Sequence, residues 1–162
     1  MKKLIIVRHA KSSWKLHVTD HERPLNDRGF SDANLVSNHF KENSLAIDFI
    51  ICSDAMRTKT TANIFASNLN IDKNIIHLNS NLYDFSGDDF IEVIKACDDS
   101  INNLMVFGHN HAITAFVNTY GDSYIGNVPT CGVVIIEFDI TNWKNLKPGK
   151  TIKTLFPRDL KL

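Results

Sequence analysis

The chain has 162 residues, the length of one domain that buries enough surface to fold without disulfides or structural metals. Hydrophobic residues make up 43% and charged residues 22%, which excludes a disordered, collagen-like or coiled-coil chain. Eighteen basic residues balance eighteen acidic ones, so the chain lacks the charge of a general nucleic-acid or anionic-membrane binder. We therefore expect one domain over residues 1–162, with no nucleic-acid or membrane partner.

The first apolar run, Leu4–Val7, is shorter than the roughly 7–15 residues that a signal peptide needs. No stretch approaches the ~20 apolar residues of a membrane-spanning helix. The three cysteines are odd in number and far apart in sequence, which is typical of reduced thiols. These features predict a cytoplasmic protein.

Short apolar runs and helical periodicities alternate along the chain. Strands are predicted, in order, at Leu4–Val7, Phe49–Cys52, Ile75–Leu78, Leu104–Phe107, Gly132–Phe138 and Thr151–Phe156. Helices are predicted from about Phe30 to Phe40 (capped by Asn26 or Asp27), Ala62 to Leu69, Phe90 to Cys97 and Ala112 to Tyr120. The polar stretch from Ala10 to Asn26 is long enough to be a functional loop.

Strands that alternate with helices predict right-handed crossovers and a parallel sheet covered on both faces. The last two predicted strands have only a turn between them, from Asn142 to Gly149, so one of them should run antiparallel. The predicted fold is α/β: a single-domain, three-layer α/β/α sandwich with a mostly parallel sheet and one antiparallel strand near the C-terminus.

Cationic and imidazole side chains follow three of the predicted strands. Arg8 and His9 follow the first strand, Arg57 comes shortly after the second, and His109 follows Leu104–Phe107. In α/β sheets, ligands bind beyond the carboxyl ends of the strands. Two guanidinium groups and two imidazoles at one sheet edge indicate an anion site, and the planar fork of arginine suits phosphate.

Each of these residues also has an ordinary structural explanation. Arg8 and His9 could be a solvated strand end, Arg57 could pair with Asp54, and His109 could cap the helix that follows it. Their shared place at three strand exits favours a common site over three separate explanations.

Three ordered motifs resemble those of the histidine phosphatase superfamily. Val7-Arg8-His9-Ala10 resembles its N-terminal Arg-His-Gly signature, Ser53-Asp-Ala-Met-Arg57-Thr-Lys-Thr-Thr-Ala62 its second-arginine motif, and Phe107-Gly108-His109-Asn110 its Gly-His motif. Arg8-His9-Ala-Lys-Ser-Ser-Trp14 and Arg23-Pro-Leu-Asn-Asp-Arg-Gly29 resemble the small SixA-type phosphohistidine phosphatases. The resemblance is colinear from Leu4 to about Val117. Ala10 stands in place of the usual Gly, and Asp54 in place of the usual Pro.

This resemblance implies that His9 is the nucleophile and forms a phosphohistidine intermediate. It implies that Arg8, Arg57 and His109 surround the phosphate oxygens, so that a cationic cage works without a metal ion or other cofactor. By the same resemblance, Lys11, Ser12 and Arg23 line the mouth of the pocket. Phosphate and vanadate are the expected site ligands.

Larger superfamily members carry a carboxylic acid that protonates the leaving group, in a segment that resembles Leu-x-Glu. Leu82-Tyr83-Asp84 occupies that place, which makes Asp84 the candidate acid. The alternative is that Asp84 is a turn or N-cap residue before the helix that contains Phe90.

Two other motifs are weaker. Cys52 and Arg57 have four residues between them, whereas cysteine phosphatase loops resemble Cys-x5-Arg. His17 with His21, and His109 with His111, have spacings seen in zinc sites, but no further ligand is suitably placed, so solvated histidines are favoured.

Three functions follow from this reading. The first is a phosphatase that removes phosphate from phosphohistidine on a phosphotransfer protein. The second is a small-molecule phosphomonoesterase or phosphoramidase on the same scaffold, and the third is an inactive phosphate-binding module. The presence of the nucleophile His9 together with Arg8, Arg57 and His109 weakens the third. The lack of a long insertion that could form a cap indicates an open site and favours the first.

Overall fold

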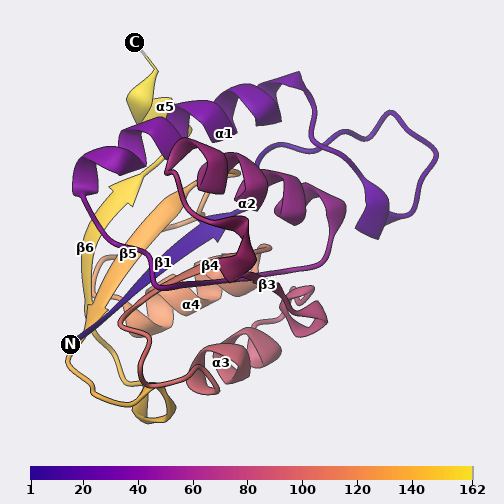
Figure 1. Ribbon diagram of the computed structural model, residues 1–162. Helices are drawn as coiled ribbons and strands as arrows, with labels where there is room; N and C mark the ends of the chain where they lie inside the picture. The colour runs from indigo at the N-terminus through magenta and orange to yellow at the C-terminus, as the bar shows by residue number, and fades with distance from the viewer. Residues whose placement is uncertain (162) are drawn as a thin grey trace.

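The computed structural model describes residues 1–161 as a six-stranded sheet between two layers of helices (Figure 1). The strands are β1 (Lys2–Arg8), β2 (Phe49–Cys52), β3 (Ile76–Leu78), β4 (Asn103–Gly108), β5 (Val133–Phe138) and β6 (Lys150–Leu155). The helices are α1 (Asp27–Phe40), α2 (Met56–Asn68), α3 (Asp88–Lys95), α4 (Ala112–Tyr120) and α5 (Pro157–Leu160). The predicted three-layer α/β/α architecture is confirmed.

The strands lie in the order β3-β2-β4-β1-β5-β6. β1, β2, β3 and β4 are parallel, and β5 runs antiparallel to both of its neighbours, β1 and β6. This is the antiparallel strand predicted near the C-terminus. Helices α1 and α2 cover one face of the sheet, and α3 and α4 cover the other (Figure 1). The carboxyl ends of β1, β2 and β4 therefore meet at one edge.

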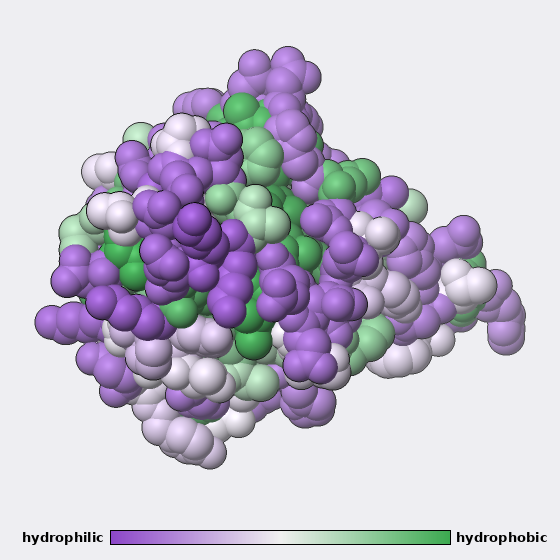
Figure 2. Space-filling view, turned by 90° about the horizontal axis from the view of Figure 1, so that it is seen from below, coloured by the Kyte–Doolittle hydropathy of each residue, from purple (hydrophilic) through white to green (hydrophobic). Residues whose placement is uncertain are grey.

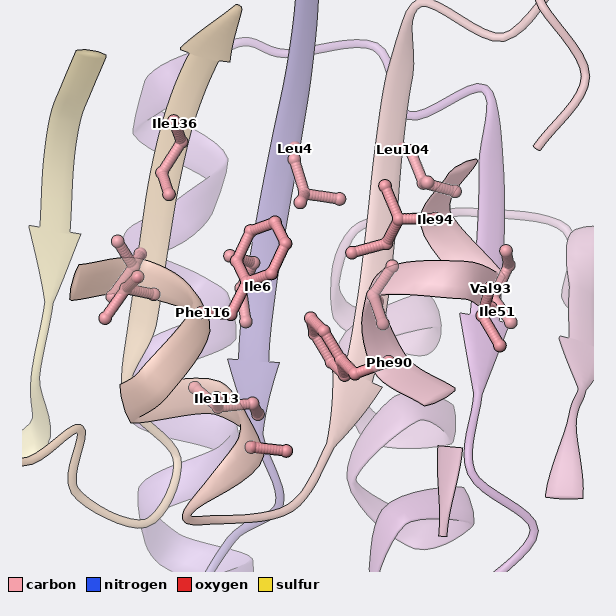
Figure 3. Close-up of a cluster of buried hydrophobic side chains, with 14 of the residues drawn as sticks. Leu4, Ile6, Ile51, Phe90, Val93, Ile94, Leu104, Ile113, Phe116 and Ile136 are labelled. Atoms are coloured by element: carbon pink, nitrogen blue, oxygen red, sulfur yellow. The ribbon is translucent and has the colours of Figure 1, made fainter. Parts of the chain in front are cut away.

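Strand β1 is buried on both faces, which explains its uninterrupted apolar sequence. Leu4 and Ile6 pack in the cluster formed with α3 and α4, near Phe90 and Phe116 (Figure 3). Ile5 and Val7, which point to the opposite face, pack in a second cluster of buried residues against α1 and α2. Every side chain from Leu4 to Val7 is fully buried, so the strand that ends at Arg8 is rigidly held.

Some element boundaries differ from the prediction. A 3-10 turn, Lys73–Ile75, precedes β3, so Ile75 lies outside the strand. Asn26, rather than Asp27, caps α1, because its side chain accepts a hydrogen bond from the Gly29 amide at 2.8 Å. Helix α5 is too short to give a periodic signal and was not predicted.

The loop between β1 and α1 is irregular apart from one 3-10 turn, Asp20–Glu22. It is fastened at its base, where Ser12 forms a bridge with Leu25 and the Asn26 amide donates to the Lys11 carbonyl at 3.0 Å. Gly29 faces the same carbonyl so closely that a Cβ atom would lie 2.1 Å from the oxygen. Glycine is therefore required where α1 crosses the start of the loop.

The surface seen from the side of α3 and α4 is mostly hydrophilic, with hydrophobic side chains visible between the polar ones (Figure 2). Across residues 1–161, no helix has the length and apolar character needed to cross a bilayer.

Replacing Gly29 by Ala should destabilise the fold by about 1–3 kcal/mol, the usual cost of forcing an extra methyl group into packed structure. The Lys11 carbonyl is backbone, so the loop or α1 must shift to make room. Gly126→Ala is the matched control, because its Cβ would approach no atom closer than 3.9 Å. Urea unfolding of both variants checks this, and equal stabilities would contradict it.

Candidate active site

The ends of β1 and β4 bring His9 and His109 together. The strands pair in register up to Arg8 and Gly108, and the His9 amide donates to the Gly108 carbonyl at 3.2 Å. The two imidazole rings lie 5.2 Å apart between centroids. The end of β2 lies beside them, since the Ser53 amide donates to the Phe107 carbonyl at 3.1 Å. The three strand exits singled out in the sequence therefore form one site.

His9 is held in a single tautomer at the floor of the site. Its Nδ1 lies 2.7 Å from the Ala10 carbonyl oxygen, which can only accept, so the proton resides on Nδ1 and Nε2 keeps its lone pair. His9 is 7% exposed. Burial, together with the positive charges of Arg57 and Arg8, lowers the pKa of His9 to about 3 despite the hydrogen bond to Ala10. The imidazole is thus neutral over a wider pH range than its ordinary pKa would allow.

His109 is almost completely buried beside His9. Its Nε2 lies 2.8 Å from the Ser53 hydroxyl, and the rings of Tyr83 and Phe85 contact it edge-on. Burial, followed by the proximity of His9 and Arg57, lowers the pKa of His109 to about 2. A Ser53 hydroxyl that donates to Nε2 leaves the proton of His109 on Nδ1, where it can be offered to an anion.

Arg8 and Arg57 place two positive charges near enough to His9 and His109 to lower the pKa of both. Arg8 Nη1 donates to the Val128 carbonyl at 2.9 Å, and Arg57, only 2% exposed, donates through Nη1 to the Asp20 carbonyl at 2.7 Å. Within residues 1–161, Arg8 Nε, Arg57 Nε and His109 Nδ1 are buried without a hydrogen-bond partner. Buried polar groups are rarely left unpaired, so three of them from three strand exits indicate a site shaped for an anion.

The predicted mouth residues lie in the β1–α1 loop. Arg23 donates through Nη1 to the Ser12 hydroxyl at 2.6 Å, and its guanidinium lies 3.5 Å from the centre of the exposed Trp14 ring. Arg23 and Ser12 are both 7% exposed, and Arg23 is near enough to His9 for its charge to help lower the pKa of His9. Lys11 and Ser12 line a surface hollow together with Trp14.

Hydrogen bonds through Thr61 tie the end of β1 to α2. The Ala10 amide donates to Thr61 Oγ1 at 3.0 Å, and Thr61 Oγ1 donates to the Arg57 carbonyl at 2.7 Å. Ala10 has no positive φ, so the backbone accommodates its methyl group in place of the usual glycine of the motif. Asp54, the other departure from the motif, pairs with His21 at 2.9 Å rather than with Arg57.

Asp84 accepts four hydrogen bonds at the start of α3. Oδ1 accepts from the amide and the hydroxyl of Ser86 at 3.0 Å, and Oδ2 accepts from the amides of Gly87 and Phe90 at 3.0 and 3.1 Å. Burial alone would raise the pKa of Asp84, but these bonds outweigh it and hold the pKa below its ordinary value. Gly87 is the N-cap of α3, so Asp84 is not the N-cap residue; its bonds are those of a turn residue that also accepts from an amide in the first turn of the helix.

The sequence reasoning missed three residues of the site: Asp20, Ser53 and Tyr83. Asp20 Oδ1 accepts from Arg23 Nε at 3.0 Å, and Oδ2 accepts from Arg57 Nη2 at 3.1 Å and from the Tyr83 hydroxyl. Ser53 and Tyr83 lie inside motifs that the sequence analysis quoted. The sequence held one indication of the role of Asp20: it lies three residues before Arg23, and a single turn brings two side chains at this spacing next to each other.

Cys52, the cysteine of the weaker phosphatase-like motif, is completely buried. Burial raises the pKa of its thiol, which therefore stays protonated and unreactive. Among the residues that the structure describes, no three His, Cys, Asp or Glu side chains are grouped closely enough to hold a metal ion.

The chain is similar to known proteins over most of its length. It is 28% identical over 153 residues to a Mycobacterium tuberculosis (strain H37Rv) protein named Uncharacterized protein Rv1276c, covering 88% of this chain and 93% of that one. Its fold is similar to a structure of the protein histidine phosphatase SixA complexed with tungstate, with a TM-score of 0.82, 17% identity and coverage of 98% and 99%. A mycobacterial glucosyl-3-phosphoglycerate phosphatase has a TM-score of 0.67 with 10% identity, covering 94% of this chain and 97% of that one. The sequence model of the histidine phosphatase superfamily (branch 1) matches residues 4–90, more than half of the chain. The chain therefore belongs to the histidine phosphatase superfamily.

Proposed function

We propose that the chain is a phosphatase that uses His9 as its nucleophile and removes the phosphoryl group from phosphohistidine on a phosphotransfer protein. The observation that carries this proposal is a set of three buried nitrogens, Arg8 Nε, Arg57 Nε and His109 Nδ1, that have no hydrogen-bond partner within residues 1–161 and lie beside a neutral imidazole. Together they offer donors to the equatorial oxygens of a phosphoryl group in front of His9.

In the first step, the lone pair on His9 Nε2 attacks phosphorus as the bond from phosphorus to the substrate's ring nitrogen breaks. The electron pair of that bond goes to the leaving nitrogen, and a substrate ring that is already protonated departs as neutral imidazole. The arginines and His109 stabilise the charge on the three equatorial oxygens, and positioning supplies most of the catalysis.

In the second step, water attacks phosphorus and the bond to His9 Nε2 breaks. The water's proton leaves to solvent or to the released phosphate, and His9 regains its lone pair. The Ala10 carbonyl contributes to this step because it retains the proton on His9 Nδ1. The phosphorylated ring is thus the protonated form, which is the better leaving group.

Phosphohistidine and an alkyl phosphate differ in whether their leaving group needs a proton from a general acid. An alkoxide is strongly basic and needs a general acid, a contribution of about 10²–10⁴-fold. The Asp84 carboxylate accepts four hydrogen bonds and has a lowered pKa, so it is poorly suited to donate a proton. Phosphohistidine needs no such acid, and this supports the first of the three functions over the phosphomonoesterase.

The test of the proposal is a comparison of kcat/KM on a phosphohistidine-containing protein, on phosphoramidate and on a panel of alkyl phosphates. We expect the phosphohistidine protein to be the best substrate and the alkyl phosphates the worst. A preference for one alkyl phosphate would support the phosphomonoesterase instead, and vanadate binding without any turnover would support the inactive module.

Arg57→Ala should cost about 2.7–4 kcal/mol of transition-state stabilisation, or roughly 10²–10³ in kcat, as loss of one preorganised oxyanion donor does. Arg57→Lys should recover only part of this loss, because lysine lacks the planar fork. Arg158→Ala, in helix α5, serves as the control, because the Arg158 guanidinium lies over the Phe156 ring and belongs to none of the quoted motifs. Steady-state rates on phosphoramidate measure the effect, and an Arg57→Ala variant as active as the control would refute the assigned role.

Asp84→Asn should destabilise the fold by about 1 kcal/mol, since an asparagine side chain replaces one acceptor oxygen of the cap with a donor. Rates on phosphohistidine and alkyl phosphate should fall by similar factors, measured together with thermal unfolding. A large loss on the alkyl phosphate alone would instead establish the general-acid role suggested by the Leu82-Tyr83-Asp84 motif.

Folding stability should fall as pH drops from about 6.5, the ordinary histidine pKa, toward 3, because unfolded His9 binds a proton and folded His9 does not. The slope is about 1.4 kcal/mol per pH unit for each such histidine. His9→Gln should lower this slope by about 1.4 kcal/mol per pH unit, measured by urea unfolding between about pH 6 and 5, above the ordinary pKa values of Asp and Glu. Identical slopes for variant and wild type would show that His9 titrates normally.

A further inference from the structure

The carboxylate of Asp20 joins three side chains around the anion site. It lies in the 3-10 turn Asp20–Glu22 of the β1–α1 loop, and it accepts hydrogen bonds from Arg57, Arg23 and the Tyr83 hydroxyl. The backbone carbonyl of the same residue accepts from Arg57 Nη1 at 2.7 Å. One residue thus engages both terminal nitrogens of Arg57.

This arrangement determines which part of Arg57 remains for an anion. With Nη1 and Nη2 of Arg57 held by Asp20, its Nε is buried without a hydrogen-bond partner among residues 1–161, and Nε of Arg8 is buried without one as well. Resting on the proposed function, we infer that Asp20 is a positioning residue that fixes Arg57 and Arg23 so that their guanidinium groups meet the phosphoryl group in a preset orientation. Preorganised donors need no rearrangement when charge develops on the oxygens.

A different role for the same carboxylate would be that of an internal competitor, which occupies the phosphate position until substrate displaces it. The exposure of the groups argues against this. The side chain of Asp20 is 44% exposed, whereas the three unpaired nitrogens of the cage are buried. Asp20 therefore holds Arg57 from the outer side of the site, away from the place prepared for the anion.

The two roles predict opposite effects of removing the carboxylate. An internal competitor would weaken anion binding, so its removal would tighten it. Loss of a negative charge near an anion site would act in the same direction by Coulomb's law alone. Only a positioning role predicts that removal of this negative charge weakens the binding of a negatively charged ligand.

The experiment uses Asp20→Asn, which retains the backbone bond to Arg57 and the size of the side chain. Glu22→Gln is the matched control: it removes the same charge from the same turn, and within residues 1–161 no hydrogen bond or ion pair joins Glu22 to an arginine. Asp20→Glu, which keeps the charge, is the second variant. Calorimetry gives the vanadate Kd of each protein, steady-state kinetics on phosphoramidate gives kcat and KM, and thermal unfolding verifies folding.

We expect Asp20→Asn to bind vanadate at least about tenfold more weakly and to lose roughly 10²-fold in kcat/KM, mostly in kcat, as misplacement of a catalytic group does. Glu22→Gln should match the wild type, and Asp20→Glu should fall between Asp20→Asn and the wild type. Vanadate binding by Asp20→Asn that equals or exceeds that of the wild type overturns this inference alone. A wild-type chain that neither binds vanadate nor hydrolyses phosphoramidate overturns the proposed function together with it.

Discussion

Positive charge buried at the carboxyl edge of the sheet is the constraint on which the rest of the site depends. A buried guanidinium is costly unless it is paired, and Arg57 is 2% exposed. Asp20 pairs the two terminal nitrogens of Arg57 but not its Nε, and the Val128 carbonyl pairs only Nη1 of Arg8. The nitrogens left over face no partner within the described residues. The fold thus maintains a cluster of donors that an anion with several oxygens would complete.

The same positive charge determines the protonation state of His9, the proposed nucleophile. Burial and the nearby arginines favour the neutral form of His9, while the Ala10 carbonyl fixes its proton on Nδ1. The groups that would bind the phosphoryl oxygens therefore also keep the attacking nitrogen unprotonated. Both depend on the ends of β1 and β4, whose pairing holds His9 against His109. A sheet buried on both faces provides the rigidity that this arrangement needs.

The sequence predicted the layers, the antiparallel strand and the meeting of three strand exits, because each has a local signal. Apolar runs such as Leu4–Val7 indicate buried strands, and the residue after such a strand lies at the sheet edge. The role of Asp20 depends on contacts with Arg57 and Tyr83, which are 37 and 63 residues away, and no local pattern reports them. The lowered pKa of His9 likewise comes from burial and from the charges of arginines such as Arg57, and no local pattern reports these surroundings.

The most direct test of the central claim is to locate the phosphoryl group on the enzyme during turnover. The enzyme would be mixed with phosphoramidate, quenched in alkali, which preserves phosphohistidine, and digested for mass spectrometry. The account predicts a phosphoryl group on His9 in the wild type and none in His9→Gln, with the phosphopeptide lost on acid treatment. Phosphorylation of another residue, or of His9→Gln to the wild-type extent, would contradict it.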